Sequence, residues 1–397
     1  MIFATYWFFV FAVLFLPVFW LLRHPSARMV WLLIACVTFH VHYAGPAGVL
    51  PIIVIGIITY LAGLTRHKII CLLAIAVCIG ALCFYKYTIF FLNGVFGQIN
   101  PEAGKVASSW AKNILPEAPP LGISFFAFEF VHYLYDVRSG TPPLRNFFQF
   151  TAFSIFFPSL VAGPIKRFEQ FIPSLKEGVA KVNAQDVVVG IVQVAFGYLK
   201  KVIADNLALY LDTYQDRFAA LHLDQRWFLF TAIAFRILLD FSGYSDIAIG
   251  LARMIGVRLP PNFNWPYFAT SIQNFWQRWH ISLSSWIRDY IYIPLGGSRH
   301  GQARRIFNEL IAFGLCGLWH GAAWNFVLWG LYHGLGLGVC VSYRYLPFEF
   351  GRNLERIFSK LRPVNWLLTQ AFVWLGWLLF FYPVDKAVNM ARLLFVI

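Results

Sequence analysis

One histidine stands in the middle of a long apolar stretch. His320 lies within "GLCGLWHGAAWNFVLWG", residues 314–330, which otherwise has the composition of a membrane helix or a deep core. A buried imidazole without a hydrogen-bond partner is unfavourable by roughly 1–3 kcal/mol, so this position needs a reason. Two interpretations have equal weight: a core histidine that is bonded to a neighbouring helix, and a group that carries chemistry. On a continuous helix, the following residues lie within about 60° of His320: Phe313, Cys316, Gly317, Ala323, Trp324 and Val327. The small side chains among them leave room for another molecule.

A second histidine lies in a segment that is both polar and aromatic. Residues 259–300, "LPPNFNWPYFATSIQNFWQRWHISLSSWIRDYIYIPLGGSRH", carry too many polar groups to face lipid. Placed on one helix, they have a polar face and an aromatic face, with His280 on the aromatic side. The polar face comprises Asn274, Gln277, Arg278, Ser282, Ser285, Arg288 and Asp289, and the opposite face Trp276, Trp279, Leu283, Trp286, Ile287 and Tyr290. Prolines and glycines bracket the segment, which predicts a re-entrant or cavity-lining element buried in protein.

Polar groups also interrupt two other apolar runs. "AFEFVHYLYD" places Glu129, His132 and Asp136 on one helical face, and "FRILLDFSGYSD" carries Arg236 and Asp240. Because buried charges tend to pair, the simplest expectation is an ion pair between Arg236 and Asp240, at i and i+4. A proton or ion path is the alternative, since such paths also use membrane carboxylates and histidines.

The composition is that of a polytopic membrane protein. The 397 residues are 59% hydrophobic and 13% charged, which is about half the charge of a soluble protein. The net charge of +14 is therefore attributed to basic cytoplasmic loops, and no nucleic-acid partner is expected. The six cysteines lie in apolar runs and form no CxxC pair, so we expect neither a disulfide framework nor a metal site.

The loop charges predict the sidedness of the chain. Residues 1–22 lack a basic start and are long enough to be a first span rather than a cleaved signal peptide. The basic loops 23–28 and 66–68 are expected inside and the uncharged loop 43–48 outside, which places the N-terminus outside. Further spans are expected at about 69–95, 121–135, 146–162, 186–210, 224–250, 306–320, 322–343 and 366–384.

The segments between the spans differ in character. Residues 97–120 are polar and contain four prolines, so they are expected to form an external loop. Residues 164–185 are basic and amphipathic, which is typical of an interfacial segment on the cytoplasmic side. Residues 344–362 carry five Lys or Arg and are expected inside. No repeat or low-complexity stretch divides the chain, which predicts a single domain over residues 1–397.

Several of these blocks together resemble a known family. "FWQRWHISLSSWIRDYIYIPLGG" and "LWHGAAWNFVLWGLYHG" are similar to the histidine blocks of the membrane-bound O-acyltransferases, within the bacterial branch that O-acetylates exopolysaccharides such as alginate. "GISFFAFEFVHYLYDVRSG", "FFPSLVAGPIKRF" and "LDFSGYSDIAIGLARMIG" resemble further blocks of that branch. The resemblance covers about residues 80–385. With the spans above, we expect an all-α polytopic bundle of about ten or eleven spans, with re-entrant or interfacial helices around a central funnel.

The resemblance implies roles for particular residues. His320 matches the catalytic histidine of the family and His280 a second, supporting one. We expect the tetrahedral intermediate to accept a hydrogen bond from His280, or from Trp N–H groups or Ser hydroxyls of residues 276–286. An imidazole is a suitable base because its ordinary pKa lies near neutrality. The side chains expected to bind substrates are Trp276, Arg278, Trp279, Ser282, Ser284, Trp286, Cys316, Gly317, Trp324, Asp240 and Tyr244.

The resemblance also implies the reaction and its setting. We expect acetyl-CoA to act as the acyl donor in the cytoplasm, with no bound cofactor, and an extracytoplasmic polysaccharide to be the final acceptor. The chain is expected in a bacterial inner membrane, with a periplasmic acetyltransferase as partner protein. The alternatives are D-alanyl or other acyl transfer to a cell-wall polymer, and a transporter in which His320 acts as a gate or relay.

Overall fold

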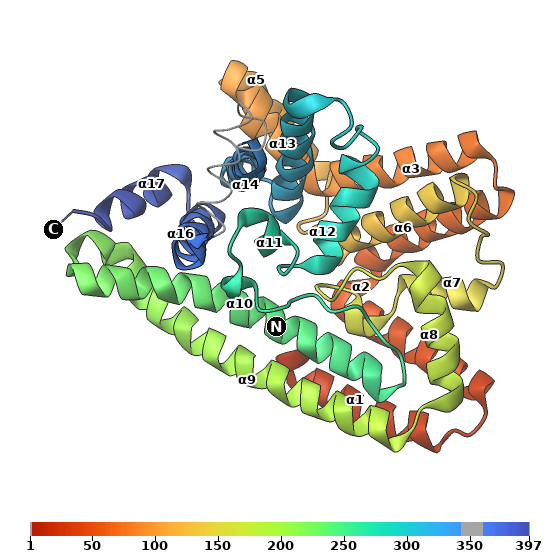
Figure 1. Cartoon of the computed structure of the whole chain (residues 1–397). Helices are drawn as coiled ribbons and strands as arrows, with labels where there is room; N and C mark the ends of the chain where they lie inside the picture. The colour runs from red at the N-terminus through yellow and green to blue at the C-terminus, as the bar shows by residue number, and fades with distance from the viewer. Residues whose placement is uncertain (1, 343–359, 397) are drawn as a thin grey trace. The chain divides into compact units, whose positions relative to one another are not determined.

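The described part of the chain is helical, as expected. The computed structural model describes residues 2–342 and 360–396, which form helices and loops without a β-strand (Figure 1). Five helices within these ranges are long and apolar enough to cross a membrane: 25–65, 68–87, 184–220, 223–254 and 362–381. The prediction of an all-α polytopic protein is confirmed. The spans predicted at 1–22 and 146–162 correspond to shorter apolar helices, Tyr6–Leu21 and Phe147–Ser159. Most of the predicted basic loop 344–362 lies outside the described residues.

The chain divides into two compact units. The first comprises Met1–Tyr198 and Gly243–Pro260, and the second Leu199–Ser242 and Pro261–Ile397. Two long helices, α9 (Ala184–Tyr214) and α10 (Leu223–Met254), contribute residues to both units. The other helices of the first unit are η1 (Ile2–Ala4), α1 (Tyr6–Leu21), α2 (Pro25–Thr65), α3 (Lys68–Leu82), η2 (Cys83–Tyr87), η3 (Phe90–Phe96), α4 (Gly97–Ile99), α5 (Pro101–Ile114), α6 (Ile123–Arg138), α7 (Phe147–Ser154), η4 (Phe157–Ser159) and α8 (Phe168–Lys181).

The second unit holds both candidate histidines. Its remaining helices are η5 (Gln215–Ala220), η6 (Pro266–Phe268), α11 (Ile272–Trp276), α12 (Ile281–Ile287), η7 (Arg288–Tyr292), α13 (Gly301–His320), α14 (Trp324–Ser342), α16 (Arg362–Phe381) and α17 (Val384–Leu393). The segment from Pro261 to Ser271 is irregular except for η6, because prolines at 261 and 266 remove backbone donors and restrict the residues before them.

Two predicted loops of the first unit differ from expectation. The external loop predicted at 97–120 contains helix α5, which begins at Pro101 and is capped by the Asn100 side chain accepting from the Ala103 N–H. The loop predicted at 43–48 is a break at one residue, Gly45, whose φ of 65° and ψ of 170° interrupt α2. Only glycine adopts that conformation readily, so a single residue is sufficient to end one helix and start the next.

Glycines allow α9 and α10 to pack closely within the first unit. A side chain on Gly190 would come within 2.6 Å of the Gly250 carbonyl oxygen, and one on Gly197 within 2.7 Å of the Gly243 carbonyl oxygen. In each helix the two glycines are seven residues apart, which places them on one face. Small residues at such an interface bring the two backbones together and increase van der Waals contact, which drives helix association in lipid.

A buried ion pair joins α6 to the loop that precedes α8. Lys166 donates to Glu129 at 2.5 Å, and the two side chains are 1% and 3% exposed. The Lys166 ammonium also lies over the rings of Phe153 and Phe171, at 5.2 and 5.7 Å. Glu129 therefore has a partner from a distant part of the sequence, which local spacing could not reveal.

Removing one member of this pair should destabilise the first unit strongly. Lys166→Met leaves the Glu129 carboxylate buried and without its cation, which is expected to lower stability by about 3–5 kcal/mol. The double variant Glu129→Leu with Lys166→Met should recover most of that loss. Thermal unfolding of the detergent-solubilised protein measures both. Lys386→Met, which breaks a pair with a largely exposed Asp216, should change stability by less than about 1 kcal/mol; an equal effect of the two lysine variants would contradict the expectation.

Candidate active site

His320 is the last residue of α13, and the chain turns immediately after it. Gly321 is extended (φ −161°, ψ 147°), and α14 begins at Trp324. The prediction that Ala323, Trp324 and Val327 lie on the same helical face as His320 is therefore wrong, because these residues follow the end of the helix. The tryptophans and glycines of this region belong to a hairpin of two packed helices.

The two helices of this hairpin approach closely through glycine. A side chain on Gly317 would lie 2.1 Å from the Phe326 carbonyl oxygen, and one on Gly330 2.1 Å from the Phe313 carbonyl oxygen. The space beside Gly317 is filled by the backbone of α14, so it does not offer room for a ligand. The small residue is explained by helix packing.

Aromatic rings surround the His320 side chain. Its imidazole is half-buried and lies edge to face with Trp319, Trp329 and Phe380, at centroid distances of 4.7, 5.2 and 5.1 Å. Trp329 is 1% exposed, and its Nε1 is a buried donor without a hydrogen-bond partner among the described residues. A base beside an unused N–H donor is an arrangement that suits acyl transfer.

The polar segment around His280 is not one helix. It is divided into α11, a turn over residues 277–280, α12 and the π-helical turn η7, so the two predicted faces do not form. His280 itself is left-handed, with φ 42° and ψ 54°, immediately before α12. This conformation costs a residue other than glycine about 1–3 kcal/mol and persists only where the surroundings enforce it.

Asn262 makes the hydrogen bonds that enforce this turn. Its Oδ1 accepts from the Ser282 N–H at 3.3 Å and from the Ser282 Oγ at 2.9 Å, and lies 3.0 Å from His280 Nδ1. The His280 ring is 1% exposed and packs edge to face on Phe241 at 4.6 Å. Burial lowers the pKa of His280 well below its ordinary value, and repulsion from His320 adds to the effect, so this imidazole is neutral at pH 7.

Trp319 lies between the two histidines. Its ring centroid is 6.2 Å from His280 and 4.7 Å from His320, which limits the separation of the two imidazoles to about 11 Å. A pocket that buries a small molecule can reach groups at that separation. The structure thus brings together the two histidines that the sequence singled out.

A cavity lined by apolar and several polar side chains opens next to this aromatic cluster. It measures about 340 Å³ and lies between the segment 273–292 and α13. Trp276 and Ser284, both predicted to bind substrate, line it together with Arg288, Arg305 and Glu309. Arg305 donates to Glu309 at 2.9 Å, whereas Arg288 is mainly exposed and pairs with Asp289. Each guanidinium already has a carboxylate partner, so an anionic ligand in this cavity would share Arg288 or Arg305 with that carboxylate.

The other predicted binding residues of the segment serve the fold. Ser282 bonds to Asn262, the Ser284 Oγ donates to the Trp279 carbonyl, and Arg278 bonds to Asn274 and to the Asn264 carbonyl. Trp279, Trp286 and Cys316 are buried, whereas Trp324 is 47% exposed. These hydroxyls are already engaged as donors, so their predicted contact with a reaction intermediate would require rearrangement.

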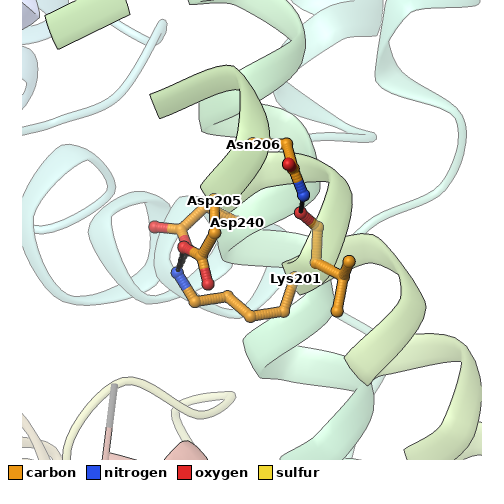
Figure 2. A network of polar contacts seen from close by, with 5 residues as sticks. Lys201, Asp205, Asn206 and Asp240 are labelled. Atoms are coloured by element: carbon orange, nitrogen blue, oxygen red, sulfur yellow. Dashed lines mark hydrogen bonds and ion pairs between the residues drawn. The ribbon is translucent and has the colours of Figure 1, made fainter. Parts of the chain in front are cut away.

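Asp240 and Tyr244, both predicted to bind substrate, have other contacts in the structure. Figure 2 shows Lys201 of α9 between Asp205 and Asp240, with 2.6 Å between Lys201 Nζ and Asp240 Oδ1. The expected pair with Arg236 is wrong: that guanidinium lies 5.3 Å over the ring of Phe381. Asp240 precedes Phe241, the ring that packs on His280. Tyr244 belongs to the first unit, where it packs on Phe3 at 4.8 Å, so the structure does not group it with the histidines.

Two buried residues of the site, Asn262 and His333, are not among those predicted from the sequence. Asn262 lies in the irregular stretch "PPNFNWP", where no periodicity points to a role. His333 of α14 is fully buried and accepts a 3.3 Å hydrogen bond from Trp276 Nε1. On a continuous helix His333 lies away from His320, but the hairpin places both of them on Trp329, at 5.0 and 5.2 Å.

The comparison with known proteins points to one family. The model of the membrane-bound O-acyltransferase family matches residues 123–344. The chain is 32% identical to the peptidoglycan O-acetyltransferase of Helicobacter pylori, over 90% of this chain and 72% of that protein. It is 40% identical to the probable alginate O-acetylase of Azotobacter vinelandii, over 66% of this chain and 50% of that protein. The teichoic acid D-alanyltransferase of Bacillus subtilis is 30% identical, over 58% of this chain and 65% of that protein. The chain thus spans about half the length of the alginate O-acetylases it matches.

The close approach of α13 and α14 should tolerate no added side chain. Gly330→Ala places a methyl group against the Phe313 carbonyl, so the helices must separate, at an expected loss of about 1–3 kcal/mol. Thermal unfolding in detergent measures the loss. Gly80→Ala in α3 is the matched control, because a side chain there meets no atom within 4 Å. Unchanged stability of Gly330→Ala would show that the hairpin is looser than described.

Proposed function

The chain belongs to the membrane-bound O-acyltransferase family, and from that membership we propose that it transfers acetyl groups from cytoplasmic acetyl-CoA for O-acetylation of an extracytoplasmic polysaccharide. The names of its relatives support this substrate class, since they include O-acetyltransferases of peptidoglycan and alginate. The observation that carries the proposal is the pair of histidines on either side of Trp319, within the region that the family model matches.

In this proposal His320 is the general base. Its imidazole takes the proton of the acceptor hydroxyl as the hydroxyl oxygen attacks the thioester carbonyl, whose π electrons move to oxygen. The tetrahedral intermediate then collapses, the carbon–sulfur bond breaks, and the thiolate receives the proton from the His320 imidazolium. We assign the hydrogen bond to the oxyanion to Trp329 Nε1, the buried donor beside His320 that has no partner among the described residues.

The two arginines that line the cavity support a CoA-type donor. Phosphate groups are bound well by guanidinium, and Arg288 and Arg305 both line this cavity beside Trp276. A thioester arm that extends from the cavity along the Trp276 ring would lead toward the aromatic cluster around His320, because Trp276 contacts Trp329 at 5.9 Å. Acetyl-CoA is accordingly the proposed donor.

The similarity to teichoic acid D-alanyltransferase favours a second candidate. That relative is 30% identical over 263 residues, so D-alanyl transfer to a cell-wall polymer would use the same two histidines. The higher identity to O-acetyltransferases makes acetyl transfer the first choice. Supplying labelled acetyl and D-alanyl donors to the same preparation separates the two.

The setting proposed for the reaction is a bacterial inner membrane, with the N-terminus outside. The basic loops 23–28 and 66–68 would then lie in the cytoplasm, as the excess of Lys and Arg in cytoplasmic loops requires. A hydrated glycan does not enter a membrane site easily, so a periplasmic acetyltransferase is the proposed first recipient of the acetyl group.

Loss of the base should remove activity without unfolding the protein. His320→Gln is expected to lower the rate of acetyl transfer by about 10²–10⁴-fold, the usual contribution of a general base. His280→Ala should lower it by a smaller factor. Transfer of labelled acetyl groups by the purified protein measures both, with His67→Gln, an exposed histidine before α3, as the control. Near wild-type activity of His320→Gln at saturating donor would exclude the base assignment.

The partner can be tested by reconstitution. The chain alone in vesicles, with acetyl-CoA and an oligosaccharide, is expected to form little acetylated sugar, because no second protein carries the acetyl group onward. Adding a periplasmic acetyltransferase encoded beside it should raise product formation. Efficient acetylation of the sugar without any added protein would refute the relay.

A further inference from the structure

One asparagine holds the whole turn that presents His280. Asn262 is 1% exposed, and its backbone carbonyl accepts from the Ile281 N–H at 2.9 Å. Its side-chain Oδ1 accepts from the Ser282 N–H and Ser282 Oγ, and the same oxygen lies 3.0 Å from His280 Nδ1. Asn262 therefore contacts three consecutive residues of the turn, eighteen to twenty positions further along the chain.

These contacts determine which nitrogen of His280 carries the proton. A backbone N–H can only donate, so the amide atom facing the Ser282 N–H is the oxygen of Asn262 and not its NH₂ group. An amide oxygen can only accept, so the hydrogen bond to His280 requires a proton on Nδ1. A neutral imidazole has one N–H, and Nε2 consequently carries a lone pair. This nitrogen is buried and has no hydrogen-bond partner among the described residues.

We propose that Asn262 is a positioning residue for the reaction, which holds His280 in the tautomer whose Nε2 accepts a hydrogen bond from an O–H or N–H group of a bound substrate. This inference rests on the proposed acyl transfer. It replaces the expectation that His280 donates to the tetrahedral intermediate, because its one proton is already committed to Asn262. The substrate group is a hydroxyl of the acceptor or an amide N–H of the pantetheine arm of the donor.

The backbone of the turn agrees with this role. His280 adopts a left-handed conformation that glycine or asparagine would adopt with less strain. A histidine at such a position indicates that its side chain is needed there, and the hydrogen bonds from Asn262 keep it in place. The ring is further confined by Phe241 from α10 and Trp319 from α13, at 4.6 and 6.2 Å.

The surroundings of His280 favour a neutral partner over an acidic one. The groups packed on the imidazole are Phe241, Trp319 and Asn262, all uncharged, and the titratable group that acts on it electrostatically is His320. A carboxylate in place of Asn262 would favour the imidazolium, which has no lone pair to offer. An asparagine fixes the same tautomer and leaves the ring neutral.

Two substitutions of Asn262 separate the tautomer from simple support of the turn. Asn262→Leu has a similar shape without an acceptor, and is expected to lower kcat/KM by about 10–100-fold, as loss of an orienting partner does. Asn262→Asp keeps the acceptor but adds a charge, so activity should persist at high pH while the acidic limb of the pH profile moves to higher pH. Asn264→Asp is the matched control, because it makes the same charge change at an exposed side chain two residues further on, and should leave the profile in place.

The kinetic constants of Asn262→Leu identify the substrate group. A rise in the KM for acetyl-CoA indicates the pantetheine amide, and a rise in the KM for the acceptor indicates its hydroxyl. Unchanged kcat and KM for both substrates, or an unshifted acidic limb in Asn262→Asp, would overturn the proposal.

The tautomer can also be observed without any activity. In protein labelled with ¹⁵N-histidine, the chemical shifts distinguish a protonated ring nitrogen from an unprotonated one, and the His280 signals are assigned by their loss in His280→Gln. The proposal expects a protonated Nδ1 and an unprotonated Nε2 in the wild type, and a mixture of tautomers in Asn262→Leu. The reverse assignment in the wild type would overturn it. Absence of acetyl transfer by the wild-type protein would instead count against the proposed function, while the spectrum would still decide the tautomer.

Discussion

Polar groups inside a helical membrane protein must find their partners within the protein, because hydrocarbon offers none. The structure meets this constraint by pairing groups that are far apart in the sequence. Glu129 bonds to Lys166, Asp240 to Lys201, and His280 to Asn262. The pairs of Glu129 and of His280 are buried, whereas Asp240 is about half exposed. Each pair connects separate stretches of the chain, so these contacts also set the arrangement of the backbone within each unit.

Close helix packing supplies the second part of that arrangement. The glycines at 317 and 330 bring α13 and α14 together until their backbones touch, and the chain turns at Gly321 directly after His320. The tight hairpin therefore carries the catalytic candidate at its end. Trp329 directly precedes Gly330 on α14, so the close approach of the two helices also brings its ring against His320. The small residues beside the histidine serve this packing, and the cavity lies elsewhere along α13, between that helix and the segment 273–292.

The sequence was sufficient to identify those residues of the site that are unusual in their surroundings by type alone. An ionisable group in an apolar run is exceptional, so His320 and His280 could be singled out, and the structure places them in one unit around Trp319. Helical periodicity was insufficient where a helix ends, as at His320, or begins, as directly after His280, because an angular count assumes a continuous helix. The predicted ion pair between Arg236 and Asp240 was wrong for a related reason. Spacing along one helix does not show that Lys201 of the neighbouring helix lies closer to the Asp240 carboxylate than Arg236 does. Asn262 had no local signal, since its contacts lie in the turn after α11.

The positions of the two histidines at helix ends also suggest how they divide their work. His320 closes the C-terminus of α13, where the unpaired carbonyls carry partial negative charge and favour the imidazolium that forms when a base takes a proton. His280 is 1% exposed and packs on the uncharged ring of Phe241, where a second cation is unfavourable. A neutral asparagine on the buried side of His280 acts in the same direction. One imidazole is thus placed to become charged during the reaction, and the other to remain neutral and accept a hydrogen bond, although both side chains come from the same aromatic cluster.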